Sequence, residues 1–334
     1  MRGPIFAIAA ATVAACSGAD GAVQSAPDAD ARLQALTTLD RRVAEVGFRL
    51  AHANAAYCPV LAASAGWALH AANQYGELQA AAVARYGLDR DLPGVLAAAS
   101  DGPAAKAGVT TGDLIVAVNG VALAPGQASQ RRFDGLARNL DAIDDALAAG
   151  PVRLTLRRAG AERTVTLDPV LVCRATFQVD DKDGFRAHAD ENGVFITAGL
   201  ARWTRDDHEL AVVLGHELAH VVLRHQTDPD APRGVVRERQ ADEVGLYMMR
   251  TAGFDWRAAP AYWRRLGEAS WAARQLQVGH DSAFRRADTL STLVTRMEEP
   301  DWADPRVIRH SQGRSLAALD DGPGMRASTQ QASG

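Results

Sequence analysis

The chain has 334 residues, of which 47% are hydrophobic, and a formal net charge of −4. A chain of this length and composition can bury two modest hydrophobic cores. Lysine and arginine are scattered along the sequence and form no basic face interleaved with aromatic side chains. Nothing in the sequence therefore points to nucleic acid as a partner.

The first 15 residues have the pattern of an export signal peptide. Arg2 is a short basic segment, and residues 5–15 form an apolar run that is too short to cross a membrane as a helix. The run ends in Val-Ala-Ala before Cys16, which resembles the lipobox of bacterial lipoproteins, in which this cysteine carries lipid. An ordinary signal peptide cut near Ala15 is the alternative. With Ser17 next, the pattern predicts a lipid-anchored protein of the cell envelope, on the outer membrane facing the periplasm.

Residues 16–30 have the composition of a tether, and residues 31–84 are predicted to form an N-terminal helical segment. Between 31 and 54, apolar residues recur at intervals of three or four, which predicts one amphipathic helix. We expect it to pack on the C-terminal domain; a partner helix bound to it is the alternative. Its apolar residues are Leu33, Leu36, Leu39, Val43, Val46 and Leu50.

The chain has 3 cysteines. If Cys16 carries lipid, Cys58 and Cys173 remain, and an oxidising compartment permits them to pair. The sequence therefore predicts a Cys58–Cys173 disulfide, with two free buried thiols as the alternative.

Residues 85–170 are predicted to be a separate β/α domain. Gly108 and Gly112 permit tight turns, residues 114–118 are an apolar run of strand length, and Asn119-Gly120 is a hairpin signal. Residues 133–149 have helical spacing, and the alternation that follows suits a final hairpin. The stretch 100–120 resembles the core of bacterial PDZ domains.

PDZ domains bind an extended peptide by adding it to a sheet edge, so this resemblance implies a possible peptide ligand. The candidate edge is residues 93–96. Asp89 and Asp91 stand close to where a terminal carboxylate would bind, which disfavours capture of a C-terminus. A spacer with the PDZ shape and no ligand is the alternative.

Residues 212–220 read Val-Val-Leu-Gly-His-Glu-Leu-Ala-His and contain the pattern H-E-x-x-H. His216 and His220 are four residues apart, so on a helix they share one face and can fill two corners of a zinc tetrahedron. Glu217 beside them can act as general base toward water at the metal. The apolar flanks, free of proline, favour a helix.

The third ligand is not where a metzincin would place it. That class needs glycine at 223 and histidine at 226, and this chain has Leu223 and Gln226. His225 lies five residues beyond His220, so on a continued helix it points away from the metal face. We interpret it as a surface histidine or as one that supports a ligand from behind.

A better candidate follows the helix-breaking loop 227–234. Helical patterning resumes over 235–249, with Glu238 and Asp242 four residues apart on one face. Glu238 can supply the third ligand, and Asp242 can accept the free N–H of a ligand histidine. The alternative is a solvated acidic face paired with Arg233, Arg237 and Arg239.

H-E-x-x-H followed by E-x-x-A-D resembles the zinc endopeptidases that include the CAAX prenyl endopeptidase and the bacterial HtpX-like stress proteases (metallopeptidase family forty-eight). Residues 192–200 resemble the strand and turn before the active-site helix of that family, and 206–211 resemble the start of that helix. Residues 280–286 resemble its histidine with an arginine six residues later, although Asp281 stands where the family has proline. The resemblance covers about residues 175–300.

The resemblance implies one Zn²⁺ per chain, a base and residues that act on the substrate. His216, His220 and Glu238 would bind zinc, Glu217 would be the base and Asp242 would orient a ligand. His280 and Arg286 would lie near the substrate or stabilise the oxyanion. A substrate would pair with an edge strand made of Val194, Phe195, Ile196 and Thr197.

The sequence thus predicts an α+β protein. A mainly helical, zincin-like protease domain (171–310) carries a small edge sheet, a PDZ-like domain is inserted before it, and a disordered tail (311–334) follows. The predicted function is a zinc endopeptidase of the cell envelope that cleaves extended or misfolded polypeptides. The alternative is a non-catalytic or chaperone-like envelope lipoprotein whose PDZ-like domain binds peptides.

Overall fold

A computed structural model of the protein describes residues 26–126, 133–191, 193–270 and 281–306. The fold is α+β, as predicted, and contains two hydrophobic cores, one in the PDZ-like region and one in the C-terminal half. The predicted signal peptide, Cys16, His280 and the predicted tail lie outside the described ranges. Within those ranges, no helix is both long and apolar enough to cross a membrane.

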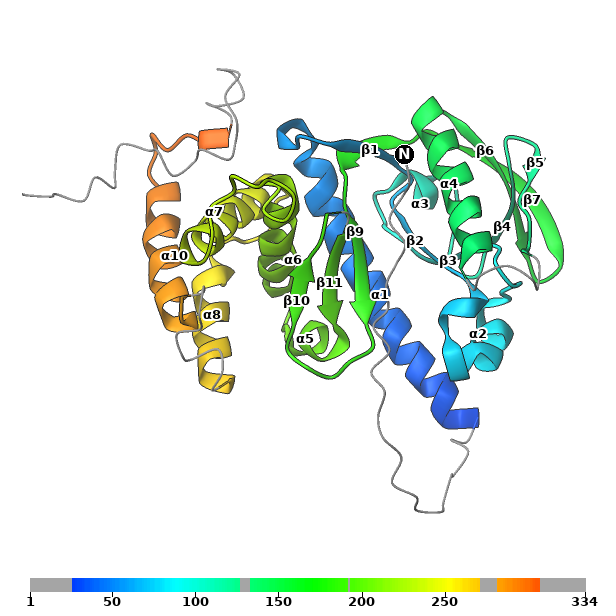
Figure 1. The fold of residues 1–334 in the computed structure, drawn as a ribbon, viewed down its shortest axis with the longest axis horizontal. Coiled ribbons are helices and arrows are strands. Elements are labelled where there is room, and N and C mark those ends of the chain that lie inside the picture. The colour runs from blue at the N-terminus through cyan, green and yellow to red at the C-terminus, as the bar shows by residue number, and fades with distance from the viewer. Residues whose placement is uncertain (1–25, 127–132, 192, 271–280, 307–334) are drawn as a thin grey trace, which may run out of the picture.

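Helix α1 (Ala26–Ala53) runs between the two regions (Figure 1). Its Leu33 belongs to the PDZ-like core, whereas Leu39 and Leu50 belong to the C-terminal core. The predicted apolar stripe therefore packs on both regions and not on the C-terminal domain alone. The tether prediction was wrong for residues 26–30, because α1 already begins at Ala26.

The PDZ-like region is built on an antiparallel sheet with the strand order β2-β3-β4-β6-β7, and β5 pairs with β4. Asn119 (φ 51°) and Gly120 (φ 84°) form the predicted hairpin turn. Helix α4 packs against β4. The strands are β2 (Trp67–His70), β3 (Gly94–Ala98), β4 (Leu114–Val118), β5 (Val121–Ala122), β6 (Val152–Arg158) and β7 (Ala161–Leu167), and the helices are α2 (Gln79–Tyr86), α3 (Pro103–Lys106) and α4 (Asp134–Ala149).

The predicted peptide-binding edge at 93–96 is not an edge. Strand β3 is flanked by β4 on one side and by β2 on the other. Strand β2 lies in the segment predicted to be helical, and its four residues are too few to give a clear alternating pattern. Strand β2 therefore occupies the side of β3 that the sequence predicted to bind a peptide.

A two-stranded ribbon joins the two regions. Strands β1 (Leu61–Ser64) and β8 (Val170–Cys173) are antiparallel, and the short helix η1 (Ala55–Tyr57) precedes them. Cys58 and Cys173 form a disulfide with a Cα–Cα distance of 5.4 Å, which confirms the predicted pairing. The bridge ties the end of α1 to the strand that leads into the C-terminal half.

The C-terminal half combines a three-stranded sheet with helices (Figure 1). The order β10-β11-β9 places β11 in the middle, antiparallel to β10 and parallel to β9. The elements are β9 (Thr176–Asp180), β10 (Ala187–Ala189), β11 (Gly193–Thr197), α5 (Ala198–Trp203), α6 (Asp207–Val222), α7 (Val235–Thr251), α8 (Ala258–Ala269) and α10 (Ala283–Met297).

The prediction that Val194 to Thr197 form an edge strand was therefore wrong. These residues make up most of β11, and both of its sides are paired. The missed neighbour, β10, has three residues with His188 at its centre and carries no strand signal of its own. The outer edge of this sheet next to α6 belongs to β10, which packs against that helix.

Candidate metal centre

Helix α6 carries the H-E-x-x-H residues and is fixed at its start by a reciprocal cap. The Asp206 carboxylate accepts a hydrogen bond from the backbone N–H of Glu209 (2.9 Å), and the Glu209 carboxylate accepts one from the backbone N–H of Arg205 (2.7 Å). Leu210, Leu214 and other apolar residues bury the helix in the C-terminal core. Both histidines therefore sit on a rigid, buried scaffold.

Helices α6 and α7 cross at a pair of glycines, Gly215 and Gly245. A Cβ atom on Gly245 would lie 2.9 Å from the backbone nitrogen of His216 and 3.1 Å from the carbonyl oxygen of Gly215. Only glycine permits this approach without moving backbone atoms. The crossing places the ligand helix directly against α7, which carries Glu238.

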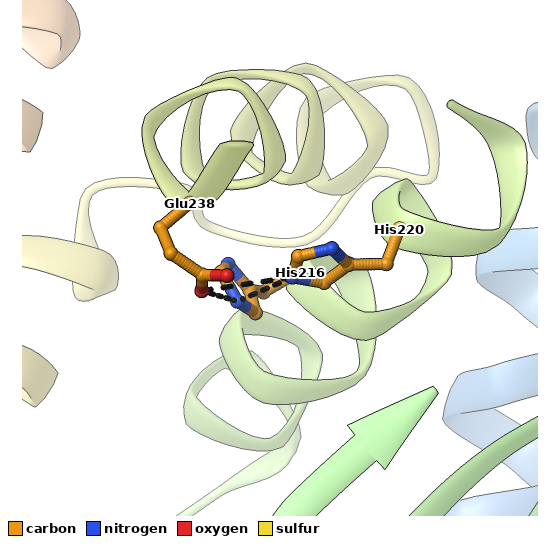
Figure 2. Close-up of side chains that lie close together, drawn as sticks. All are labelled: His216, His220 and Glu238. Carbon is orange, nitrogen blue, oxygen red and sulfur yellow. Dashed lines mark hydrogen bonds and ion pairs between the residues drawn. The ribbon is translucent and has the colours of Figure 1, made fainter. Parts of the chain in front are cut away.

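The structure brings His216, His220 and Glu238 together, with their side chains pointing toward one another (Figure 2). The two Nε2 atoms lie 3.2 Å apart, and Glu238 Oε2 lies 3.4 Å from Nε2 of His216 and 3.7 Å from Nε2 of His220. A tetrahedral zinc site with bonds of about 2.0–2.2 Å has ligand–ligand edges of about 3.3–3.6 Å. The three buried side chains therefore fit three corners of such a site.

The pKa shifts of His216 and Glu238 favour a positive charge beside the Glu238 carboxylate, whereas that of His220 favours a neutral imidazole. Burial and Arg286 lower the pKa of His216, but hydrogen bonds with Asp242 and Glu238 outweigh them and raise that pKa to about 9. Burial lowers the pKa of His220 to about 4. Burial opposes ionisation of Glu238, but its hydrogen bonds with both histidines lower its pKa. A carboxylate and two imidazoles thus surround a place for a cation.

Arg237 holds the other oxygen of Glu238, since its Nε lies 3.2 Å from Glu238 Oε1. This contact leaves Oε2 to face the histidines. Glu238 does pair with Arg237, as the alternative interpretation held, but Arg239 pairs with Asp281 instead, and Glu238 is only 3% exposed. The face is therefore buried and not solvated.

Asp242 and Arg286 support His216 from behind. Asp242 Oδ1 lies 3.0 Å from His216 Nδ1, the position predicted for a residue that orients a ligand. Arg286 Nε donates to Asp242 Oδ2 (2.8 Å), its Nη2 donates to Oδ1, and its guanidinium lies 3.3 Å from the centre of the Trp263 ring. Arg286 therefore positions Asp242, and its predicted role near the substrate or the oxyanion stays a prediction.

Glu217 differs from every other carboxylate at the centre. Its side chain is 9% exposed, and among the described residues none donates a hydrogen bond to it. Burial raises its pKa, and the charge of Glu238 adds to that effect, although His216 opposes it. A carboxylate in this environment accepts a proton readily.

His225 does not point away from the metal face. Its Nδ1 lies 2.9 Å from Nδ1 of His220, and its side chain is buried. The helical-wheel argument fails because α6 ends at Val222, three residues before His225. Of the two interpretations made from sequence, support of a ligand holds and a surface histidine does not.

Asp281 stands where the resembled family has proline. Its carboxylate accepts a hydrogen bond from Arg239 Nε (2.8 Å), which ties the start of α10 to α7. Sequence patterning missed this contact, along with those of Trp263 and Gln240, because no local pattern marks residues that meet only in the folded chain.

Comparison with known proteins agrees with this geometry. Residues 174–236 match the model of peptidase family M48, and residues 94–158 match the model of the PDZ domain. Mitochondrial metalloendopeptidase OMA1 from Arabidopsis thaliana is 27% identical over 137 residues, which cover 32% of this chain and 28% of that protein. No solved structure gives a significant match.

The family match ends at residue 236, just before Glu238, so the assignment of Glu238 rests on its position beside the two histidines. The alignment with the curated relative spans less than a third of that relative's length, 28%. The family match, the domain match and the site agree with one another. The chain thus contains a PDZ domain and a region that matches the metallopeptidases of family M48.

Proposed function

We propose that this protein is a zinc-dependent endopeptidase that hydrolyses peptide bonds in extended or misfolded polypeptides. The observation that carries the proposal is the convergence of His216, His220 and Glu238 at tetrahedral spacing, next to a buried Glu217. A structural zinc site usually has four protein ligands. Among the described residues three ligands converge beside a carboxylate with a raised pKa, which fits catalysis better.

The donor set of two imidazole nitrogens and one carboxylate oxygen suits zinc, which, when bound, polarises the scissile carbonyl and makes nearby water more acidic. Glu217 then takes the proton of the attacking water on its carboxylate and delivers it to the leaving amine. Asp242, held by Arg286, keeps the Nδ1 proton of His216 in place so that its Nε2 stays directed at the metal.

The outer edge of β10 supports an extended substrate. This strand ends its sheet and packs against α6, so a polypeptide paired with it would run beside the ligand helix. A cavity of about 310 Å³ opens next to His220, and Asp190, which follows β10, contributes to its wall. Gln226 Nε2 donates to the carbonyl of Ala189 (3.3 Å), so an incoming chain would replace this contact.

The metal requirement is tested with the full-length protein and casein as an unfolded substrate. We expect about one zinc per chain, loss of proteolysis after chelator dialysis, and recovery on adding zinc. Glu238→Ala should lose most of the bound zinc and the activity, because only two ligands remain. Glu243→Ala, on the same helix with its carboxylate bonded to the Tyr247 hydroxyl, is the control and should retain both. Full zinc occupancy in Glu238→Ala would contradict the ligand assignment.

We also propose that the protein works in the bacterial cell envelope, anchored by lipid on Cys16. The support is the apolar run that ends in Val-Ala-Ala-Cys, together with the Cys58–Cys173 disulfide, which suits an oxidising compartment. Cys16→Ala should move the protein out of the membrane fraction or leave it unprocessed. A wild-type protein found wholly in the soluble fraction, with an unmodified N-terminus, would contradict the anchor and leave the peptidase proposal intact.

A further inference from the structure

Helix α6 ends in a turn that folds the chain back over its own last residues. The backbone N–H of Arg224 donates to the carbonyl of Val221 (3.0 Å), and that of His225 donates to the carbonyl of His220 (3.0 Å). Arg224 has a left-handed φ of 57°. These bonds define a Schellman cap, in which the residue after the left-handed position packs against the residue five before it. Here those two residues are His225 and His220.

The side chains of these two histidines are also hydrogen-bonded to each other. His220 Nδ1 lies 2.9 Å from His225 Nδ1, and His225 Nε2 lies 3.3 Å from Gln240 Oε1. An amide oxygen only accepts, so His225 Nε2 carries the proton that donates to Gln240. His225 Nδ1 is then the acceptor, and His220 Nδ1 must carry the proton between the rings. The remaining nitrogen of His220, Nε2, is left with a free lone pair facing His216 and Glu238.

We propose that His225, held by Gln240, is a positioning residue that fixes His220 in the tautomer whose Nε2 binds the metal. The inference rests on the proposed zinc site and goes beyond it. The two ligand histidines are supported by different chemistry: a charged pair, Asp242 with Arg286, stands behind His216, and a neutral pair, His225 with Gln240, stands behind His220.

The neutral pair suits its surroundings. Glu217, Glu238 and Asp242 already place three buried carboxylates at this centre, and another acid behind His220 would add a charge that the described contacts of His220 do not balance. A neutral imidazole accepts a hydrogen bond through one nitrogen and donates one through the other. His225 can therefore orient the His220 ring without adding a charge. Removal of such a partner from behind a metal ligand typically lowers metal affinity by about 10- to 100-fold.

The test compares variants of the full-length protein by zinc affinity, measured in competition with a chelator. His225→Phe keeps a ring against His220 but removes both nitrogens, and should lower zinc affinity by about 10- to 100-fold. His225→Asn restores an acceptor near the same place and should recover much of the loss. His208→Phe makes the same chemical change near the start of α6, where the ring accepts from the Asp255 backbone, and should leave affinity unchanged.

A spectroscopic readout separates positioning from general damage. In protein labelled with ¹⁵N at histidine, two-bond correlations distinguish the Nδ1–H from the Nε2–H tautomer. Wild-type zinc protein should show His220 only as the Nδ1–H form, with a slowly exchanging proton. In His225→Phe that proton should exchange rapidly, while the Nδ1 proton of His216, held by Asp242, stays protected.

If His225→Phe fails to fold, Gln240→Leu tests the same chain of hydrogen bonds one step farther out and should lower zinc affinity in the same direction, by less. Zinc affinity in His225→Phe within twofold of wild type, or an unchanged His220 proton, would overturn the inference while the peptidase proposal stands. A wild-type protein that binds no zinc at all would instead overturn the proposed function.

Discussion

Two buried carboxylates in different regions of this protein have opposite surroundings. Asp113, in the PDZ domain, is 0% exposed and accepts hydrogen bonds from Arg158 Nε (2.9 Å), Arg163 Nη2 (2.8 Å) and the backbone N–H of Thr110 (2.9 Å). Glu217, at the metal centre, is 9% exposed and receives no hydrogen bond from the described residues. The two side chains are almost equally buried, but among the described residues only Asp113 has hydrogen-bond donors around it.

The donors decide what each carboxylate can do. Burial opposes ionisation of Asp113, but Arg158, Thr110 and Arg163 outweigh it and lower its pKa, so this group stays charged and joins β4 to the β6–β7 hairpin. Burial raises the pKa of Glu217, so its carboxylate takes up a proton more readily than an ordinary glutamate does. The first arrangement contributes to folding, and the second is suited to proton transfer.

The largest expected effect is on proteolysis. Glu217→Gln keeps the shape of the side chain and removes its capacity to accept a proton, so casein cleavage should fall by about 10²–10⁴-fold. Zinc content should stay at the wild-type level, because Glu217 is not one of the three converging side chains. The unfolding free energy should stay the same or rise, since an unpartnered buried carboxylate has been removed.

Turnover close to wild type in Glu217→Gln would remove Glu217 from the role of base. Loss of zinc along with activity would show that the residue supports the metal site instead. Asp113→Asn is the matched control in this assay and should leave casein cleavage per folded molecule unchanged.

The second largest effect is expected at Asp113, and it is on stability and not on proteolysis. Asp113→Asn should lower the free energy of unfolding by about 2–3 kcal/mol, because hydrogen bonds that involve charged groups contribute about 1.5–3 kcal/mol. The folded pKa of Asp113 is lowered, so its contribution is present above the unfolded value of 3.8 and is lost as pH falls through the folded pKa. Urea unfolding at pH 7 measures the difference between variant and wild type. A variant as stable as wild type would mean that the two arginines contribute nothing to folding.

The parts of the site that lie on one helix could be predicted from sequence. The spacing of four residues fixes His216 above His220, and the same spacing joins Glu238 to Asp242. The cap at Asp206 and the strand at 114–118 are similarly local. Patterns of this kind depend only on the geometry of one element.

What could not be predicted depends on contacts between elements or on where elements end. The pairing of Arg286 with Asp242 joins α10 to α7, and the approach of Gly215 to Gly245 sets how α6 and α7 cross. His225 was misplaced because a helical wheel has no meaning beyond the helix end. Strands β2 and β10 are too short to show alternation, and each one pairs with a strand that the sequence analysis predicted to be an edge.

A third carboxylate, Asp40 on α1, has a raised pKa but stands away from the metal ligands. It therefore tests whether a raised pKa is sufficient for catalysis. Burial raises its pKa to about 7, and none of the described residues donates a hydrogen bond to it, so it resembles Glu217 away from any metal ligand. Because the folded pKa lies above the unfolded value of 3.8, this group costs stability progressively as pH rises from 3.8 to about 7, and the cost is constant above that. A shift of this size corresponds to at most about 4 kcal/mol, and we expect about 1–2 kcal/mol because the side chain is only partly buried.

Asp40→Asn should therefore stabilise the protein, by more at pH 8 than at pH 5.5, with no change in casein cleavage per folded molecule. Urea unfolding at the two pH values measures the gain, and Asp101→Asn, at an exposed turn, controls for the loss of one charge. An equal gain at both pH values would show that Asp40 is not protonated in the folded state. A pH-dependent gain with normal cleavage would show that a raised pKa does not by itself make Asp40 a catalytic base, since Asp40 stands away from the metal ligands beside which Glu217 lies.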